Sequence, residues 1–146
     1  MERELVFELP NDVQCIEEAV EFVARRCCDC QAVARRLRLN FRVGLTEALS
    51  NAMIYGNGRD PSKRVRVEVF LRPDCLTARV TDQGTGFDPN LVPDPTTPRN
   101  LHRVGGRGLF LMRELMDEVQ FNEQGNSVTL ILNLLEGGVL RGEASA

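Results

Sequence analysis

The chain has 146 residues, of which 42% are hydrophobic and 27% charged, and its formal net charge is −3 at pH 7. These values are typical of one soluble globular domain, and the negative charge argues against direct binding of nucleic acid. No apolar run approaches the roughly 20 residues of a membrane span, and the N-terminus lacks the features of a signal peptide. We therefore expect a cytoplasmic protein that binds no membrane.

The cysteine and histidine content limits the chemistry further. The chain has five cysteines and one histidine. An odd cysteine count without a signal peptide argues against a disulfide framework, and a zinc site would need a second paired cluster besides Cys27, Cys28 and Cys30. A hydrolytic triad would rest on His102 alone, without a G-x-S-x-G turn. We expect reduced cysteines of no special role and no triad.

The N-terminal part is expected to form a strand followed by helices. Alternating apolar residues predict a strand over residues 4–9, and Pro10-Asn11-Asp12 ends it and offers a helix cap. Apolar residues at i, i+3, i+4, i+7 and i+11 predict an amphipathic helix over residues 16–27. The phase is lost over residues 28–31, so residues 32–37 are predicted to form a separate short helix.

A second long helix is predicted over residues 41–55, with Asn40 as its cap and Gly56-Asn57-Gly58 at its end. Glu47 and Asn51 lie four residues apart on one face, beside the apolar stripe. A carboxylate next to an amide oxygen can place a proton acceptor beside a magnesium ligand. A solvated helix face is the simpler explanation of this pair taken alone.

Two alternating segments, residues 65–71 and 75–80, predict a β-hairpin. Asp82 follows the second strand, and Gly84 and Gly86 lie in the turn beyond it. A carboxylate in this place can accept a hydrogen bond from the exocyclic amine of adenine, and the glycines let a flat ligand approach closely. An ordinary D-x-G-x-G turn would also explain the stretch.

A proline-rich loop over residues 88–104 is expected to be a lid, because loops of this length are usually functional. It leads into a glycine-rich turn that opens a helix: Gly105, Gly106, Arg107 and Gly108. Free backbone N–H groups and the positive end of a helix dipole suit phosphate, and the arginine adds a charge. The turn lacks the G-K-[ST] of a Walker loop and does not follow a strand as a Rossmann fingerprint would.

Two further strands are predicted over residues 119–123 and 127–134, which makes five strands and three main helices in all. The remaining residues are small, polar and glycine-rich. We expect one domain over residues 1–135 and a flexible tail over residues 136–146.

Three motifs occur in one order: E-A-L-S-N on a helix, D-Q-G-T-G after a strand, and G-G-R-G opening a helix after a lid. Together they resemble the Bergerat-fold (GHKL) ATPases, the superfamily of gyrase, Hsp90, histidine kinases and MutL. With M-D-E-V after the second glycine turn, the chain looks most like the bacterial anti-sigma factor serine/threonine kinases. The resemblance implies an α+β two-layer sandwich, a mostly antiparallel mixed sheet with helices on one face.

The resemblance also implies roles for single residues. Asn51 would be the ligand of Mg²⁺, Glu47 the general base, and Asp82 the acceptor of the adenine amine, with Gly84 and Gly86 giving the base room. The phosphates of ATP would be held by the second glycine turn: Gly105, Gly106, Arg107 and Gly108. Arg103 is an alternative to Arg107 as the phosphate ligand. Tyr55 stands where many relatives have histidine.

The implied function is ATP-dependent phosphorylation of an anti-anti-sigma (STAS-domain) protein, in a homodimeric kinase that otherwise holds a sigma factor. A catalytically silent ATP-binding switch that sequesters a partner is the main alternative, against which Glu47 speaks because a passive holder needs no base. A histidine kinase fragment would need a phospho-acceptor histidine, and residues 1–40 contain none. A gyrase or chaperone module would need further domains.

Overall fold

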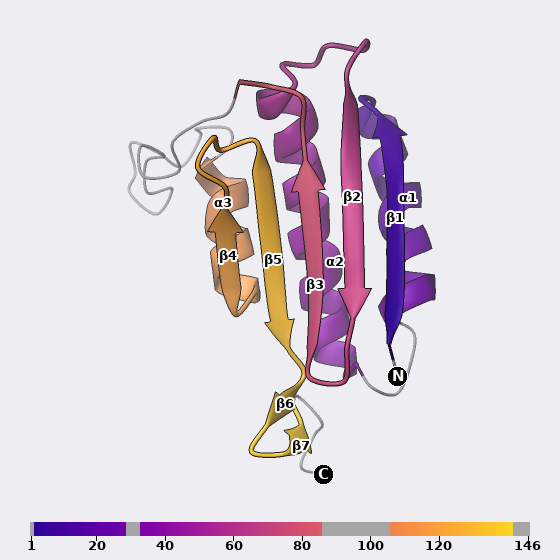
Figure 1. The fold of residues 1–146 in the computed structure, drawn as a ribbon, viewed down its shortest axis with the longest axis vertical. Helices are drawn as coiled ribbons and strands as arrows, with labels where there is room; N and C mark the ends of the chain where they lie inside the picture. The colour runs from indigo at the N-terminus through magenta and orange to yellow at the C-terminus, as the bar shows by residue number, and fades with distance from the viewer. Residues whose placement is uncertain (1, 29–32, 86–105, 142–146) are drawn as a thin grey trace.

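In the computed structural model, which describes residues 2–28, 33–85 and 106–141, three helices cover one face of a five-stranded sheet (Figure 1). The strands occur in the order β1-β2-β3-β5-β4, and every pairing between them is antiparallel. The α+β two-layer class with helices on one face is therefore confirmed. The strands of the sheet are β1 (Arg3–Pro10), β2 (Arg64–Leu71), β3 (Cys75–Thr81), β4 (Glu118–Phe121) and β5 (Ser127–Asn133). The helices are α1 (Ile16–Val23), α2 (Arg35–Asn51) and α3 (Gly106–Leu115).

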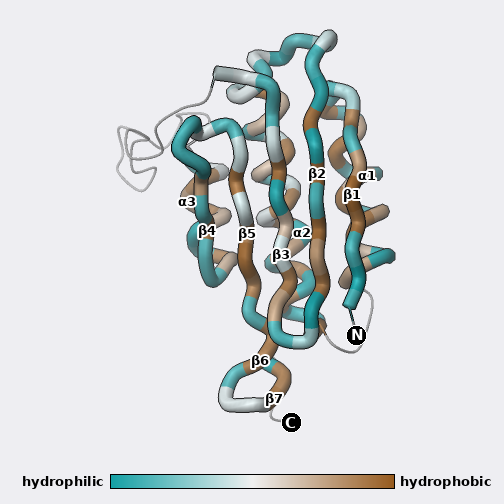
Figure 2. Tube along the Cα trace, in the orientation of Figure 1, coloured by the Kyte–Doolittle hydropathy of each residue, from teal (hydrophilic) through white to brown (hydrophobic). Residues whose placement is uncertain are grey.

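The alternation of apolar and polar residues decides which face of each strand is buried. In β2 the side chains of Val65, Val67 and Val69 are completely buried, whereas those of Arg64 and Arg66 are exposed. The same alternation can be followed along the central strands in Figure 2. Because side chains point to opposite faces in turn, one face of the sheet packs against the helices, and among the described residues no helix covers the other face (Figure 1).

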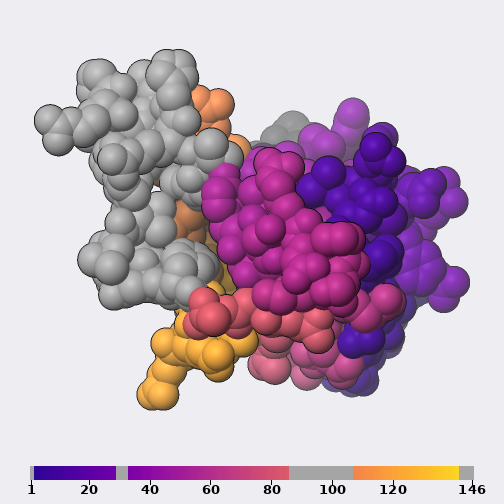
Figure 3. Space-filling view, turned by 90° about the horizontal axis from the view of Figure 1, so that it is seen from above, coloured from indigo at the N-terminus to yellow at the C-terminus, as the bar shows by residue number. Residues whose placement is uncertain are grey.

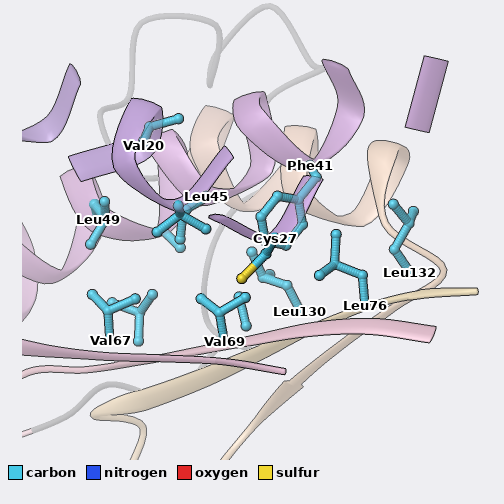
Figure 4. Packing of buried hydrophobic residues seen from close by; sticks show 14 of the residues in the cluster. Val20, Cys27, Phe41, Leu45, Leu49, Val67, Val69, Leu76, Leu130 and Leu132 are labelled. Carbon is cyan, nitrogen blue, oxygen red and sulfur yellow. The ribbon is translucent and has the colours of Figure 1, made fainter. Parts of the chain in front are cut away.

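Helix α2 forms the centre of the core. Its residues Phe41, Leu45 and Leu49 are at most 1% exposed and point toward the sheet (Figure 4). There they face side chains of the central strands, among them Val69 and Leu130. This packing fixes the helix that carries Glu47 and Asn51 against the sheet.

Helix α2 begins earlier than predicted. The separate short helix over residues 32–37 and the cap at Asn40 are both wrong, because one continuous helix runs from Arg35 to Asn51. Leu37 and Phe41 are both buried at i and i+4, so burial of one apolar stripe carries the helix through Asn40. The residue at its N-cap is Ala34, which makes no side-chain cap hydrogen bond.

A small hairpin follows β5, formed by β6 (Leu135–Glu136) and β7 (Val139–Leu140). Arg141 attaches this hairpin to the domain, since its guanidinium pairs with Asp117 and donates to the carbonyl oxygen of Asn133 at 3.3 Å. The division into a domain and a flexible tail stays a prediction. Residues 142–146 lie outside the described part of the chain.

Candidate functional site

Three segments meet at the upper end of the molecule in Figure 1: the C-terminal half of α2, the end of β3 and the start of α3. They carry the predicted residues Glu47 and Asn51, Asp82 and Gly84, and Gly106, Arg107 and Gly108. Gly86 and Gly105 lie outside the described residues, as does Arg103. The choice between Arg103 and Arg107 as the phosphate ligand therefore stays open.

The start of α3 packs directly on the face of α2 that bears the predicted pair. A Cβ atom added to Gly108 would lie 2.9 Å from Glu47 Oε2, and 3.1 Å and 3.2 Å from Asn51 Nδ2 and Oδ1. Gly108 is buried, so any side chain there would have to displace one of these groups. The fold thus brings the first and third motifs into contact.

The environment of Glu47 suits a proton acceptor. Burial raises the pKa of its carboxyl group above the usual value, and the nearby positive charge of Arg107 opposes that rise. A raised pKa makes the carboxylate a stronger base at neutral pH, provided that it remains ionised. Arg107 favours this ionised form and stands in the first turn of α3, where an anion would also meet the helix dipole.

Asn51 is suited to hold an ion that a ligand brings with it. Within residues 2–28, 33–85 and 106–141, its side chain has no hydrogen-bond partner, and no cluster of three His, Cys, Asp or Glu side chains could bind a metal. Mg²⁺ is commonly held by one or two protein oxygens together with the phosphates of a nucleotide. A single amide oxygen beside a helix N-terminus fits that mode.

Asp82 lies buried just beyond the end of β3. Its side chain is 9% exposed, and Oδ1 accepts a hydrogen bond from the backbone N–H of Gly84 at 2.8 Å. Its own backbone N–H donates to the carbonyl oxygen of Asn126 at 2.9 Å. Burial raises the pKa of this carboxyl group, while the Gly84 N–H and the charge of Lys63 oppose the rise.

Two glycines lie close to Asp82 where a side chain would not fit. A Cβ atom added to Gly56 would lie 2.1 Å from Asp82 Oδ2, and one added to Gly84 would lie 1.8 Å from the carbonyl oxygen of Gly56. The backbone of Gly56 therefore packs flat against the carboxyl group. The left-handed conformation that ends the preceding helical segment occurs instead at Gly58, with φ of 59°.

The sequence predicts only that Gly56 ends a helix, and not that its backbone packs against Asp82. The helical chain does continue past α2 in a π-helical turn, Ala52–Gly56, which ends beside Asp82. Asn57, the next residue, is a second polar group that the motifs do not include, and its side chain is buried. The sequence does contain a signal for the role of Gly56: one glycine is enough to end a helix, and the segment G-N-G contains two.

A sequence profile of the histidine kinase-like ATPase domain matches residues 9–132, which include all of the segments just described. The chain belongs to this family. The resemblance to the GHKL ATPases inferred from the motifs is thereby confirmed, and the family implies binding of ATP.

Proteins of similar sequence carry more specific names. The chain is 30% identical over 98 residues to "Serine-protein kinase RsbW" of Listeria monocytogenes serotype 4a, a match that covers 62% of each protein. It is 27% identical over 116 residues to the RsbW protein of Oceanobacillus iheyensis, covering 71% of this chain and 73% of the relative. An "Anti-sigma F factor" of Geobacillus thermodenitrificans is 32% identical over 90 residues, with coverage of 60% and 61%. These names match the predicted subfamily, although the chain spans less than two thirds of the Listeria protein. No helix in the described part of the chain is long and apolar enough to cross a membrane.

Gly56→Ala should lower the affinity for ATP by at least about tenfold. A shift of about 1 Å in a positioned group can cost an enzyme about 100-fold in rate, and we expect a smaller but clear loss in binding. The added methyl group would lie 2.1 Å from Asp82 Oδ2 and must push the carboxyl group aside. Titration calorimetry with ATP measures the effect. Gly44→Ala is the matched control, because the atoms nearest to its methyl group would belong to the flexible side chain of Met116, with the terminal Cε closest at 3.0 Å. Equal affinities of the two variants would contradict the proposed contact.

Proposed function

We propose that the protein is an anti-sigma factor kinase, which transfers the γ-phosphate of ATP to a serine or threonine hydroxyl of a partner protein. The observation that carries this proposal is the contact of the α3 start with both Glu47 and Asn51 through Gly108. This contact supports the proposal because phosphoryl transfer requires a proton acceptor, an ion ligand and a phosphate-binding group close together, and we assign these roles to Glu47, Asn51 and the start of α3.

Each residue has a part in binding the nucleotide. The Asp82 carboxylate accepts a hydrogen bond from the adenine amine, and the backbones of Gly56 and Gly84 leave room for the base. The phosphates lie at the start of α3, where the helix dipole and Arg107 attract them. We assign the same phosphate-binding role to Gly105 and Gly106, and the base-contacting role to Gly86, from the resemblance alone.

The chemical step then needs one proton transfer. Asn51 would hold Mg²⁺, which when bound neutralises charge on the phosphates. Glu47 accepts the proton of the attacking serine or threonine hydroxyl. At the same time, the oxygen of this hydroxyl forms a bond to the γ-phosphorus. The bond between this phosphorus and the oxygen bridging to the β-phosphate breaks, and ADP leaves. Burial raises the pKa of Glu47, which strengthens it for this task.

The partners follow from the relatives rather than from the fold. The names of the relatives, "Serine-protein kinase" and "Anti-sigma F factor", support a protein that binds a sigma factor and phosphorylates a second protein. From the resemblance, we take this second protein to be an anti-anti-sigma (STAS-domain) protein. A homodimer and a cytoplasmic location belong to the same proposal. Binding of the sigma factor in one state and of the STAS-domain protein in the other would make the protein a partner switch.

A transfer assay tests the kinase directly. The protein is incubated with Mg²⁺, ATP labelled in the γ-phosphate, and STAS-domain proteins of the same organism. We expect label on a serine or threonine of one STAS-domain protein, identified by mass spectrometry. If ATP binds but no STAS-domain protein is labelled, the kinase assignment is overturned and a silent ATP-binding switch replaces it.

A further inference from the structure

A closed ring of hydrogen bonds joins Asn57, Arg64 and Gln83, the residue that follows Asp82. Asn57 Nδ2 donates to the carbonyl oxygen of Arg64 at 3.0 Å, and the Arg64 N–H donates to Gln83 Oε1 at 2.7 Å. The Gln83 N–H closes the ring by donating to Asn57 Oδ1 at 2.7 Å. Asn57 is 1% exposed, so the polar atoms of its side chain rely on protein partners.

Asn57 also connects the two halves of the candidate site. Its backbone N–H donates to the carbonyl oxygen of Ala52 at 2.7 Å, which closes the π-helical turn that directly follows Asn51. Its side chain holds the N–H of Gln83, which directly follows Asp82. Through its backbone and its side chain, one buried residue thus ties the helix that carries Asn51 to the end of the strand that precedes Asp82.

The ring fixes how Asp82 sits against Gly56. Gly56 precedes Asn57, and its backbone packs on the carboxyl group of Asp82. Backbone movement of Gln83 would move Asp82 with it, since the two residues are joined by one peptide plane. A carboxylate accepts a hydrogen bond from the 6-amino group of adenine but repels the 6-oxo group of guanine. Its position therefore decides between the two bases.

We propose that Asn57 is a positioning residue that holds Asp82 through Gln83 and so sets the preference of the site for adenine over guanine nucleotides. The inference rests on the proposed function only in that ATP binds at Asp82. It requires neither phosphate transfer nor a particular partner protein. Asn57 itself touches no nucleotide in this scheme.

Asn11 provides a matched control within the same buried network. Its side chain also makes three hydrogen bonds: Nδ2 donates to the carbonyl oxygens of Met53 at 3.2 Å and Asp60 at 2.9 Å, and Oδ1 accepts from Asn57 Nδ2 at 3.1 Å. Asn11 is 8% exposed and belongs to the segment between β1 and α1, which lies beside the turn after α2 in Figure 3. It makes no hydrogen bond to Gln83 among the described residues. Its loss should therefore affect stability without releasing Asp82.

The test compares affinities for ATP and GTP by titration calorimetry in wild type, Asn57→Ala and Asn11→Ala, with thermal unfolding of each protein. We expect Asn57→Ala to reduce the ATP/GTP preference at least about tenfold, because loss of positioning can cost up to about 100-fold. Asn11→Ala should lower the unfolding temperature similarly and keep the preference. Asn57→Asp retains the acceptor for the Gln83 N–H, so it should restore most of the preference without restoring stability.

Each outcome decides the inference. If Asn57→Ala does not fold, Asn57→Ser takes its place, because a small hydroxyl keeps a polar group in the buried site and still falls short of Gln83. An unchanged ATP/GTP preference in a folded Asn57 variant, or an equal loss in Asn11→Ala, overturns the positioning role. Absence of ATP binding in the wild type instead overturns the proposed function itself.

Discussion

Glu47→Gln is expected to reduce phosphate transfer by about 10²–10⁴-fold, the usual contribution of a general base, while ATP affinity changes little. Glutamine has nearly the same shape and keeps the contact with Gly108, but it cannot accept the proton of the attacking hydroxyl. Single-turnover transfer of the γ-phosphate to the proposed STAS-domain partner measures the chemical step. Calorimetry with ATP measures binding separately.

The control for this variant is Glu123→Gln, which makes the same exchange at an exposed carboxylate between β4 and β5. It should leave both measurements unchanged. The pH profile gives a second criterion. Because burial raises the pKa of Glu47, transfer should decline on acidification at a higher pH than an exposed carboxyl group would produce. Transfer at the wild-type rate in Glu47→Gln would remove this residue from the mechanism.

Asp82→Asn should weaken ATP binding by about 10- to 150-fold, the equivalent of one hydrogen bond to a charged group at 1.5–3 kcal/mol. The same variant should leave the nucleotide-free protein at least as stable as the wild type. Burial raises the pKa of Asp82, so its charge disfavours the folded state at neutral pH. Asparagine removes the charge and can still accept from the Gly84 N–H through Oδ1. Calorimetry and thermal unfolding without nucleotide measure the two effects.

The sign of the stability effect gives Asp82→Asn an internal check. The unfavourable contribution of Asp82 is present above its raised pKa and disappears as the pH falls through it, so the gain from asparagine should shrink on acidification. Asp74→Asn, at the exposed turn between β2 and β3, should change neither ATP affinity nor this pH dependence. A variant that loses stability and still binds ATP normally would assign Asp82 a purely structural role.

Much of the fold could be predicted because its signals are local. The alternation of valines with charged residues in β2 marks that strand, and the short turn at Pro73-Asp74 marks its hairpin with β3. The pairing of β1 with β2 could not be predicted in this way. It joins Arg3 to Leu71 across two intervening helices, and only packing of those helices on one face of the sheet makes it favourable.

The site shows the same division between local and tertiary signals. The spacing of Glu47 and Asn51 on one helix face follows from helix geometry alone. The contact of both with Gly108 depends on how α3 packs on α2, which no local pattern encodes. Asn57 lies in a turn, where asparagine is common, so its burial among backbone groups of other segments leaves no trace in the sequence. At Asn40 the sequence misleads in the opposite direction. Asparagine is a good helix cap, but burial of Leu37 and Phe41 continues the helix through this position.

We propose that Asn51, Asp82 and the start of α3 form a magnesium-dependent ATP site, which titration calorimetry with ATP in the presence and absence of Mg²⁺ can reveal. We expect the wild type to bind ATP more tightly with Mg²⁺ than in EDTA. Asn51→Ala should lose this difference and still bind the adenine base through Asp82. Absence of ATP binding in the wild type, or an unchanged effect of Mg²⁺ in Asn51→Ala, would contradict this proposal.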